Sequence, residues 1–128
     1  MASGLVRLKT RADFVRVAAR GRRAVRPGFI LQAAARPVET ESGTVRIGFT
    51  ASRKVGNAVV RNRAKRRLRA AAAEVLRRAG RPGTDYVLIA RGGTGERRYA
   101  ELVGDLEAAL RQVERGGDRR PSRRDEEG

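Results

Sequence analysis

The sequence predicts an α/β (α+β) two-layer sandwich, in which three helices pack against a small, mostly antiparallel sheet. Three observations lead to this prediction. Three long segments repeat their apolar residues with a helical period, and the short apolar segments between them have the length and alternation of strands. Pro-Gly pairs, at Pro27-Gly28 and Pro82-Gly83, interrupt the chain between segments. The expected order is helix, three strands, helix, strand, helix.

The first predicted helix spans residues 11–20. Thr10 stands three residues before Asp13, which is typical of a helix N-cap followed by a carboxylate in the first turn. Gly21 is expected to end the helix. Its inward stripe is expected to consist of Phe14, Val17 and Ala18.

Two of the three following strands can be positioned from their patterns. Residues 29–33 form an apolar run directly after Pro27-Gly28. Residues 45–51 alternate apolar residues with Arg46, Gly48 and Thr50, which is the period of a half-buried strand. The polar segment from Glu39 to Gly43 is interpreted as the loop of a hairpin between these strands.

The remaining elements follow from longer apolar patterns. A helix is predicted over residues 58–79, with Gly80 as its stop. Its core stripe is expected to consist of Ala64, Leu68, Ala71, Ala72, Val75, Leu76 and Ala79. Residues 86–90 form a continuous apolar run, which is typical of a strand covered on both faces. A last helix is predicted over residues 99–113, with Leu102, Val103, Leu106, Ala109, Leu110 and Val113 facing inward.

The length of the chain, 128 residues, is that of one domain, which we expect to span residues 1–115. From residue 116 onward the sequence is polar and charged and has no periodicity. Residues 116–128 are therefore expected to form a disordered charged tail.

The net charge of +16 is concentrated in two blocks. Residues 1–28 contain eight basic residues and one acidic residue, and residues 51–80 contain ten basic residues and one acidic residue. The other segments are close to neutral. A charge used only for solubility would be spread more evenly, so the two blocks indicate one or two faces that bind a polyanion, most simply a nucleic acid.

The chain lacks the residues that several classes of protein function usually require. The chain has no Cys, which excludes disulfides and thiolate metal sites, and no His, the commonest general base. Its acidic residues stand singly rather than at metal-binding spacings. No apolar window is long enough for a membrane span or a secretory signal. We therefore expect no catalytic or metal-ligating residue, no membrane contact, no obligate protein partner and a cytoplasmic location.

One face of the second predicted helix is strongly basic. Residues three and four apart share a helix face, so Arg61, Lys65 and Arg69 form one row and Asn62 and Arg66 form the adjacent row. The rows extend over about two turns, which matches a few successive RNA phosphates. Guanidinium groups bind phosphate through paired donors, and an Asn amide can meet a 2′-OH or a base edge.

A solvated helix face is the simpler interpretation of such a charge run, and a membrane-surface helix is another. Solvated faces usually alternate positive and negative charges, but no acidic residue lies between Arg53 and Arg69. A membrane-surface helix needs a strongly apolar opposite face, and here that stripe is mostly Ala. Nucleic-acid binding is therefore favoured.

The segment Lys54–Arg66, which reads Lys-Val-Gly-Asn-Ala-Val-Val-Arg-Asn-Arg-Ala-Lys-Arg, resembles the signature motif of the bacterial ribonuclease P protein. The similarity extends to Asp13-Phe14, to the segment 46–49 and to the segment 85–91, which stand in the family's order. It covers roughly residues 5–113.

The resemblance implies a ribosomal-protein-like fold with a left-handed crossover through the basic helix, an exception to the usual handedness. It also implies a non-catalytic subunit that binds the ribonuclease P RNA and helps it remove 5′ leaders from precursor tRNA, with Mg²⁺ bound mainly by the RNA. The residues expected to contact the RNA are Lys54, Arg61, Asn62, Arg63, Lys65, Arg66 and Arg69.

The resemblance further implies a cleft between the first helix and the sheet for the single-stranded leader. Its candidate residues are Phe14, Arg16 and Gln32. Family members often have further aromatic residues at the positions of Ala18 and Gln32, and a stacked base contributes roughly 1–3 kcal/mol. Leader binding by this chain is therefore expected to depend more on Arg16 and other cations. Phe14 is equally well interpreted as a core residue.

Two alternatives share the charge distribution. A structural RNA-binding protein, such as a ribosomal protein or an RNA chaperone, would have the same charge and fold class but no reason to contain the motif at residues 54–66. A DNA-binding regulator would insert the basic helix into a major groove. The helix-turn-helix arrangement requires a preceding helix at turn distance, which this sequence lacks.

Overall fold

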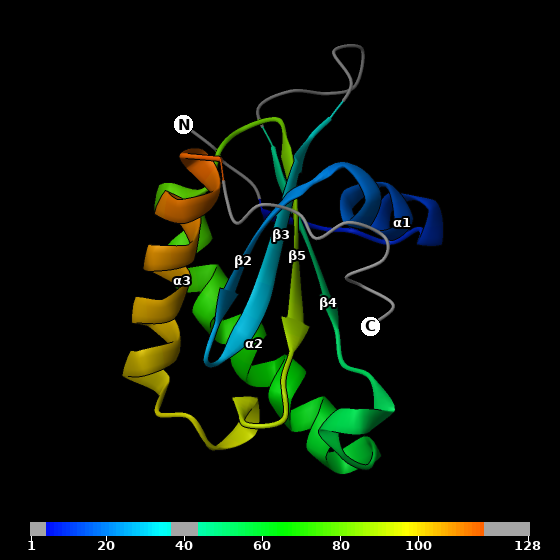
Figure 1. Cartoon of the computed structure of the whole chain (residues 1–128), viewed down its shortest axis with the longest axis vertical. Coiled ribbons are helices and arrows are strands. Elements are labelled where there is room, and N and C mark those ends of the chain that lie inside the picture. Colours follow the sequence, from blue (N-terminus) through cyan, green and yellow to red (C-terminus); the bar gives the residue numbers. More distant parts are fainter. Residues whose placement is uncertain (1–4, 37–43, 117–128) are drawn as a thin grey trace.

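The computed structural model describes residues 5–36 and 44–116 and contains three α-helices and a five-stranded sheet in these ranges (Figure 1). In chain order the elements are β1 (Leu5–Arg7), α1 (Arg11–Arg20), β2 (Arg22–Arg26), β3 (Phe29–Ala35), β4 (Val45–Thr50), η1 (Arg53–Val55), α2 (Ala58–Ala79), β5 (Thr84–Ala90), η2 (Thr94–Glu96) and α3 (Tyr99–Glu114), where η denotes a short 3-10 helix. The observed bounds of α1 and α2 are those predicted, and α3 ends one residue later than predicted.

The strands of the sheet lie in the order β1-β4-β5-β3-β2. β4 pairs in parallel with β1 and with β5, whereas β3 pairs antiparallel with β2 and with β5. The sheet is therefore mixed, with two antiparallel and two parallel pairings, whereas the prediction was a mostly antiparallel sheet. The chain leaves β4, crosses through α2 and returns in β5, and a helical crossover of this kind joins strands that run in the same direction. The left-handedness of this crossover stays a prediction.

The predicted hairpin between residues 29–33 and 45–51 is not formed, because β5 lies between β3 and β4. Its expected loop, residues 39–43, lies outside the described residues, as does the expected tail beyond residue 116. The structure instead has a hairpin between β2 and β3, with Arg26 opposite Phe29 and Pro27-Gly28 as its turn. β2 is an arginine-rich edge strand, so no hydrophobic alternation marked its position.

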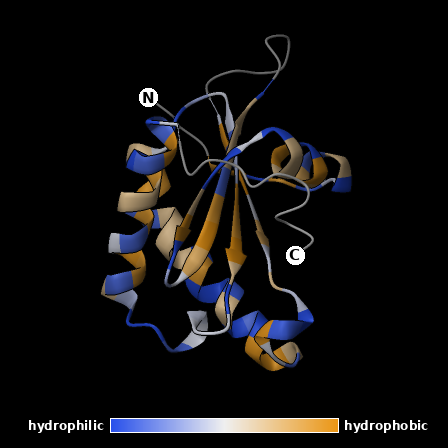
Figure 2. Cartoon of the chain, viewed as in Figure 1, coloured by the Kyte–Doolittle hydropathy of each residue, from blue (hydrophilic) through white to orange (hydrophobic). Residues whose placement is uncertain are grey.

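Helices cover both faces of the sheet. α2 and α3 pack against one face, where Leu31, Ile47 and Leu88 are fully or almost fully buried. Figure 2 shows the apolar residues gathered between these helices and the strands. α1 packs against the opposite face through Val17, which meets Val87 in a second cluster. α1 thus adds a partial third layer to the two layers that were predicted. It can pack there because β5 is apolar on both faces, as predicted.

Part of the α1 face remains uncovered. The strand register places Gln32 beside Val87 and Ile30 beside Ile89, so these residues share the α1 face. Thr50 lies beside Ile89 on the same face. We call the half-buried residues Ile30, Gln32, Thr50 and Ile89 the open sheet face. It borders α1 at one end, whereas the other face of the same strands is sealed by α2 and α3.

Candidate RNA interface

The start of α2 is set by two local features. The side-chain oxygen of Asn57 accepts a hydrogen bond of 2.9 Å from the backbone N–H of Val60, which caps the helix. Gly56 has a φ of +152°, and a Cβ at this position would lie 2.8 Å from the side chain of Val60. The loop therefore requires glycine here, and it directs the basic motif into the first turns of α2.

Six of the seven predicted RNA-contacting residues lie on the outward side of these turns, and Lys54 lies in η1 just before them. Ala64 and Leu68 of the same helix are fully buried and fix which side faces the core. Arg61 and Lys65 are half-buried beside them. The remaining predicted residues are exposed: Lys54, Asn62, Arg63, Arg66 and Arg69. We call the seven residues together the basic strip.

No carboxylate lies within ion-pair distance of the basic strip among residues 5–36 and 44–116. The ion pairs in these ranges involve Arg16, Arg36, Arg46, Arg78 and Arg97. The cations of the strip therefore repel one another in the free protein, and an anion bound there would relieve this repulsion.

The structure adds a residue to this region that the sequence did not indicate. The guanidinium of Arg69 lies 5.5 Å from the ring centroid of Phe49, and that of Arg7 lies 5.9 Å from the same centroid. Both distances are typical of a cation–π contact. Because β1 pairs with β4, Arg7 is brought next to the basic strip although it stands far away in the sequence. The pairing of a three-residue edge strand has no local sequence signal.

The predicted leader-binding residues have different surroundings. Gln32 lies on the open sheet face. Phe14 lies at the border between α1 and this face, half-buried, with its ring against Gly48. Ala18 was predicted to face inward but is exposed, since Val17 is the residue of α1 that is buried against the sheet. An aromatic residue at position 18 would therefore be exposed on the surface of α1.

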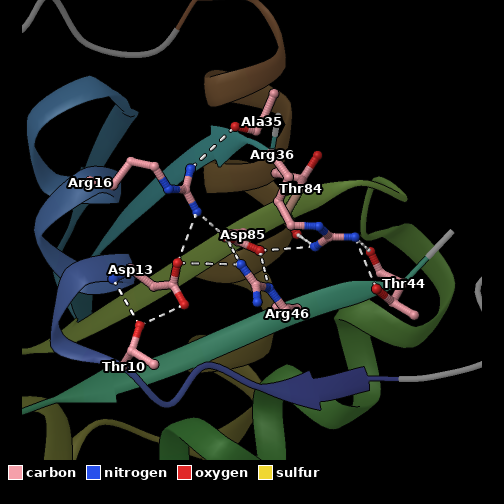
Figure 3. A network of polar contacts seen from close by, with 9 residues as sticks. All are labelled: Thr10, Asp13, Arg16, Ala35, Arg36, Thr44, Arg46, Thr84 and Asp85. Carbon is pink, nitrogen blue, oxygen red and sulfur yellow. Dashed lines mark hydrogen bonds and ion pairs between the residues drawn. The ribbon is translucent and has the colours of Figure 1, made fainter. Parts of the chain in front are cut away.

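Arg16 is engaged within the fold. One terminal nitrogen of its guanidinium forms an ion pair with Asp85, and the other donates a hydrogen bond of 3.3 Å to the backbone oxygen of Ala35 (Figure 3). Arg16 also lies 3.7 Å from a carboxylate oxygen of Asp13. Its guanidinium is thus held by contacts within the fold, which weakens the expectation that Arg16 serves as a free cation for the leader.

Asp85 is the centre of a polar network that the sequence did not reveal (Figure 3). Its side chain is fully buried and binds three guanidinium groups. Arg46 donates two hydrogen bonds of 2.7 Å, one to each carboxylate oxygen, and Arg36 donates one of 2.9 Å. Burial raises the pKa of Asp85, but the hydrogen bonds from Arg46, Arg36 and Arg16 outweigh burial and hold the pKa below its usual range. The carboxylate is therefore ionised at neutral pH.

Residues 5–36 and 44–116 contain no group of three or more acidic side chains that could hold a metal ion. None of the helices in the same ranges combines the length and apolar character needed to cross a membrane. What these ranges do contain is an exposed cationic helix face and a half-exposed sheet surface, and this combination suits the binding of a polyanionic strand.

Comparison with known proteins identifies the family. The family profile of ribonuclease P matches residues 3–114, which is nearly the whole chain. The chain belongs to the ribonuclease P protein family. The resemblance based on residues 54–66 is thereby confirmed, and the alternative of a ribosomal protein or an RNA chaperone is not favoured.

Relatives and solved structures agree with membership of the ribonuclease P protein family. The chain is 54% identical over 114 residues to the ribonuclease P protein component of Paramagnetospirillum magneticum, an alignment that covers 88% of this chain and 86% of the relative. It is 53% identical to the component of Gluconacetobacter diazotrophicus, with 88% and 95% covered. The RNase P protein of Staphylococcus aureus is 28% identical and has a TM-score of 0.66, with 82% of this chain and 92% of that chain aligned.

Proposed function

We propose that this chain binds the catalytic RNA of ribonuclease P through the basic strip and the 5′ leader of precursor tRNA through the open sheet face. In this role the protein brings the two RNAs together and has no active site of its own. The observation that carries the proposal is the basic strip, a mostly exposed group of cations around Asn62 that has no carboxylate partner in the described residues.

The basic strip suits an RNA backbone because its charge and its spacing are both complementary to phosphates. Arginine presents several donors in a plane and can bind a phosphate with two of them. Asn62 is exposed within the same strip and can both donate to and accept from a 2′-OH or a base edge. Binding would also release counterions from the RNA, which adds to the affinity.

The open sheet face suits a single strand. Ile30 and Ile89 offer apolar surface, Gln32 offers an amide, and the ring of Phe14 stands at the border. Unpaired bases can contact such a surface by stacking and by hydrogen bonds to their edges. In Figure 1 the first turns of α2 lie at the end of the molecule where β4 and β5 end. A strand that runs over the open sheet face could therefore continue toward the basic strip.

The cleavage chemistry is assigned in this proposal to the RNA and its bound Mg²⁺. Mg²⁺ prefers oxygen ligands and usually keeps several of its waters. The described residues offer no acidic cluster that fits this ion, whereas RNA phosphates do offer suitable oxygens. The protein would contribute by raising the affinity of the RNA for substrate and for the metal.

The test is a reconstitution with a bacterial ribonuclease P RNA at low Mg²⁺ concentration, in which 5′ cleavage of a precursor tRNA is measured with and without the protein. The proposal predicts strong stimulation of the RNA and no cleavage by the protein alone. Tight binding without stimulation would instead favour a structural RNA-binding protein. Cleavage by the protein alone would mean that it contains an active site.

A further inference from the structure

The polar network around Asp85 joins elements that are distant in the sequence. Arg16 comes from α1, Arg36 follows the end of β3, Arg46 comes from β4, and Asp85 itself lies on β5. The carboxylate is fully buried, and a buried charge is tolerated only when it is paired and hydrogen-bonded. The network thus fixes one arrangement of three strands and one helix.

α1 has few other attachments to the rest of the fold. Val17 is the only residue of this ten-residue helix that is buried. Val17 and the half-buried ring of Phe14 hold the helix against the sheet, but they leave it free to tilt and slide, because apolar contact is not directional. The guanidinium of Arg16 supplies the direction, since its contacts with Asp85 and with the backbone oxygen of Ala35 have defined geometry.

A second contact reinforces this attachment. Arg46, which donates two hydrogen bonds to Asp85, also lies 3.6 Å from a carboxylate oxygen of Asp13 on α1. Asp85 therefore acts on α1 by two routes: directly through Arg16, and through Arg46 to Asp13. Asp13 and Arg16 stand on either side of Phe14 in the sequence, so both routes attach to the turn of α1 that contains Phe14.

We propose that Asp85 is a positioning residue for leader binding, because it anchors α1 and thereby holds Phe14 at the border of the open sheet face. The inference rests on the proposed function and extends it, since Asp85 is fully buried and touches no RNA itself. It acts through Arg16 and Arg46. Arg16 accordingly serves as the link between Asp85 and α1 rather than as a free cation for the leader.

The experiment uses the reconstituted holoenzyme with two substrates, a precursor tRNA with a long single-stranded leader and one with a one-nucleotide leader. The variant is Asp85→Asn. The matched control is Asp105→Asn, which removes another buried carboxylate, one that receives a hydrogen bond of 2.7 Å from Arg97. Asp105 belongs to α3, on the other face of the sheet.

We expect Asp85→Asn to weaken binding of the long-leader substrate by about fivefold or more, the equivalent of roughly 1 kcal/mol for one stacked base. Binding of the short-leader substrate and of the ribonuclease P RNA should change little. Asp105→Asn should change the binding of both substrates to the same extent, even if it lowers the melting temperature as much as Asp85→Asn does. Equal losses on both substrates, or equal selectivity in both variants, would overturn the inference.

Arg16→Ala provides a second variant in case Asp85→Asn fails to fold. It cuts the direct link to α1 but leaves Asp85 paired with Arg36 and Arg46, so no buried charge is left alone. The same selective loss is expected. The double variant Asp85→Asn with Arg16→Ala should lose little more than the stronger single variant, because both remove the same anchor. Fully additive losses would indicate that Arg16 contacts the leader independently of Asp85.

Hydrogen exchange of the free protein gives a readout without RNA. Asp85→Asn should speed exchange of the α1 amides relative to those of α2 and α3, whereas Asp105→Asn should not. Unchanged protection of α1 would contradict the anchoring step. A wild-type holoenzyme that ignores leader length would instead refute the proposed leader site, and the inference with it. If the long-leader substrate still binds more tightly than the short-leader substrate in both Asp85→Asn and Arg16→Ala, the role of Asp85 is refuted but the proposed leader site is not.

Discussion

The ring of Phe14 occupies the space that a side chain at Gly48 would need. A Cβ built on Gly48 would lie 2.4 Å from one ring carbon of Phe14 and 2.5 Å from another. The contact joins α1 to β4 directly, at the border of the open sheet face. Glycine at position 48 is therefore a requirement of the way α1 packs, although its neighbours alternate as in an ordinary strand.

Gly48→Ala is expected to displace Phe14 and to destabilise the protein. Relief of such a contact by a shift of a packed ring typically costs about 1–3 kcal/mol. The free energy of unfolding, measured with urea, should fall by this order, and binding of a long-leader precursor tRNA should weaken. Gly92→Ala is the control, because a Cβ at Gly92 would meet no heavy atom within 4 Å. Similar effects from both substitutions would contradict this account of Gly48.

Arg66→Ala should weaken binding to the ribonuclease P RNA. Arg66 is exposed and has no carboxylate partner among the described residues, so the loss reflects the RNA contact rather than the fold. A charge-assisted hydrogen bond is worth about 1.5–3 kcal/mol, which corresponds to roughly tenfold or more in affinity. Arg77→Ala, near the other end of α2, is the control on the same helix. Arg120→Ala, beyond the described residues, should also have less effect than Arg66→Ala.

Binding to the RNA should be steeply dependent on salt. The logarithm of the association constant is expected to fall by roughly 0.7–0.9 for each phosphate contact per logarithmic unit of salt. Arg66→Ala should reduce this slope by about one contact. Filter binding or fluorescence titration over a series of KCl concentrations would measure it. Affinity that does not change with salt would contradict an electrostatic role of the basic strip.

Acid should destabilise the protein through Asp85. The pKa of Asp85 is lower in the folded protein than its usual value of 3.8. Its ionised form therefore contributes stability above the usual pKa, and this contribution is lost as the pH falls through the lower, folded-state pKa. Urea unfolding measured between neutral pH and about pH 2 should show that loss. In Asp85→Asn the decline below about pH 4 should be shallower, and an unchanged decline would contradict the assignment.

Much of the local structure can be predicted from neighbouring residues. The bounds of α1 and α2 follow from caps and stops within a few residues, such as Thr10 before α1 and Gly80 after α2. The basic strip follows from the helical period, because residues three and four apart share a face whatever the rest of the chain does. The apolar run in β5 likewise indicates a strand covered on both faces. Such features need no knowledge of distant partners.

The pairing of strands and the surroundings of single polar residues could not be predicted in this way. β5 lies between β3 and β4, so the expected hairpin is absent and the sheet is mixed. Arg16, Arg36 and Arg46 converge on Asp85 only because this strand order brings their elements together. In the sequence Asp85 is a lone acid and Arg7 an ordinary cation. Long-range contacts depend on the packing of the whole chain, and no local period encodes which elements become neighbours.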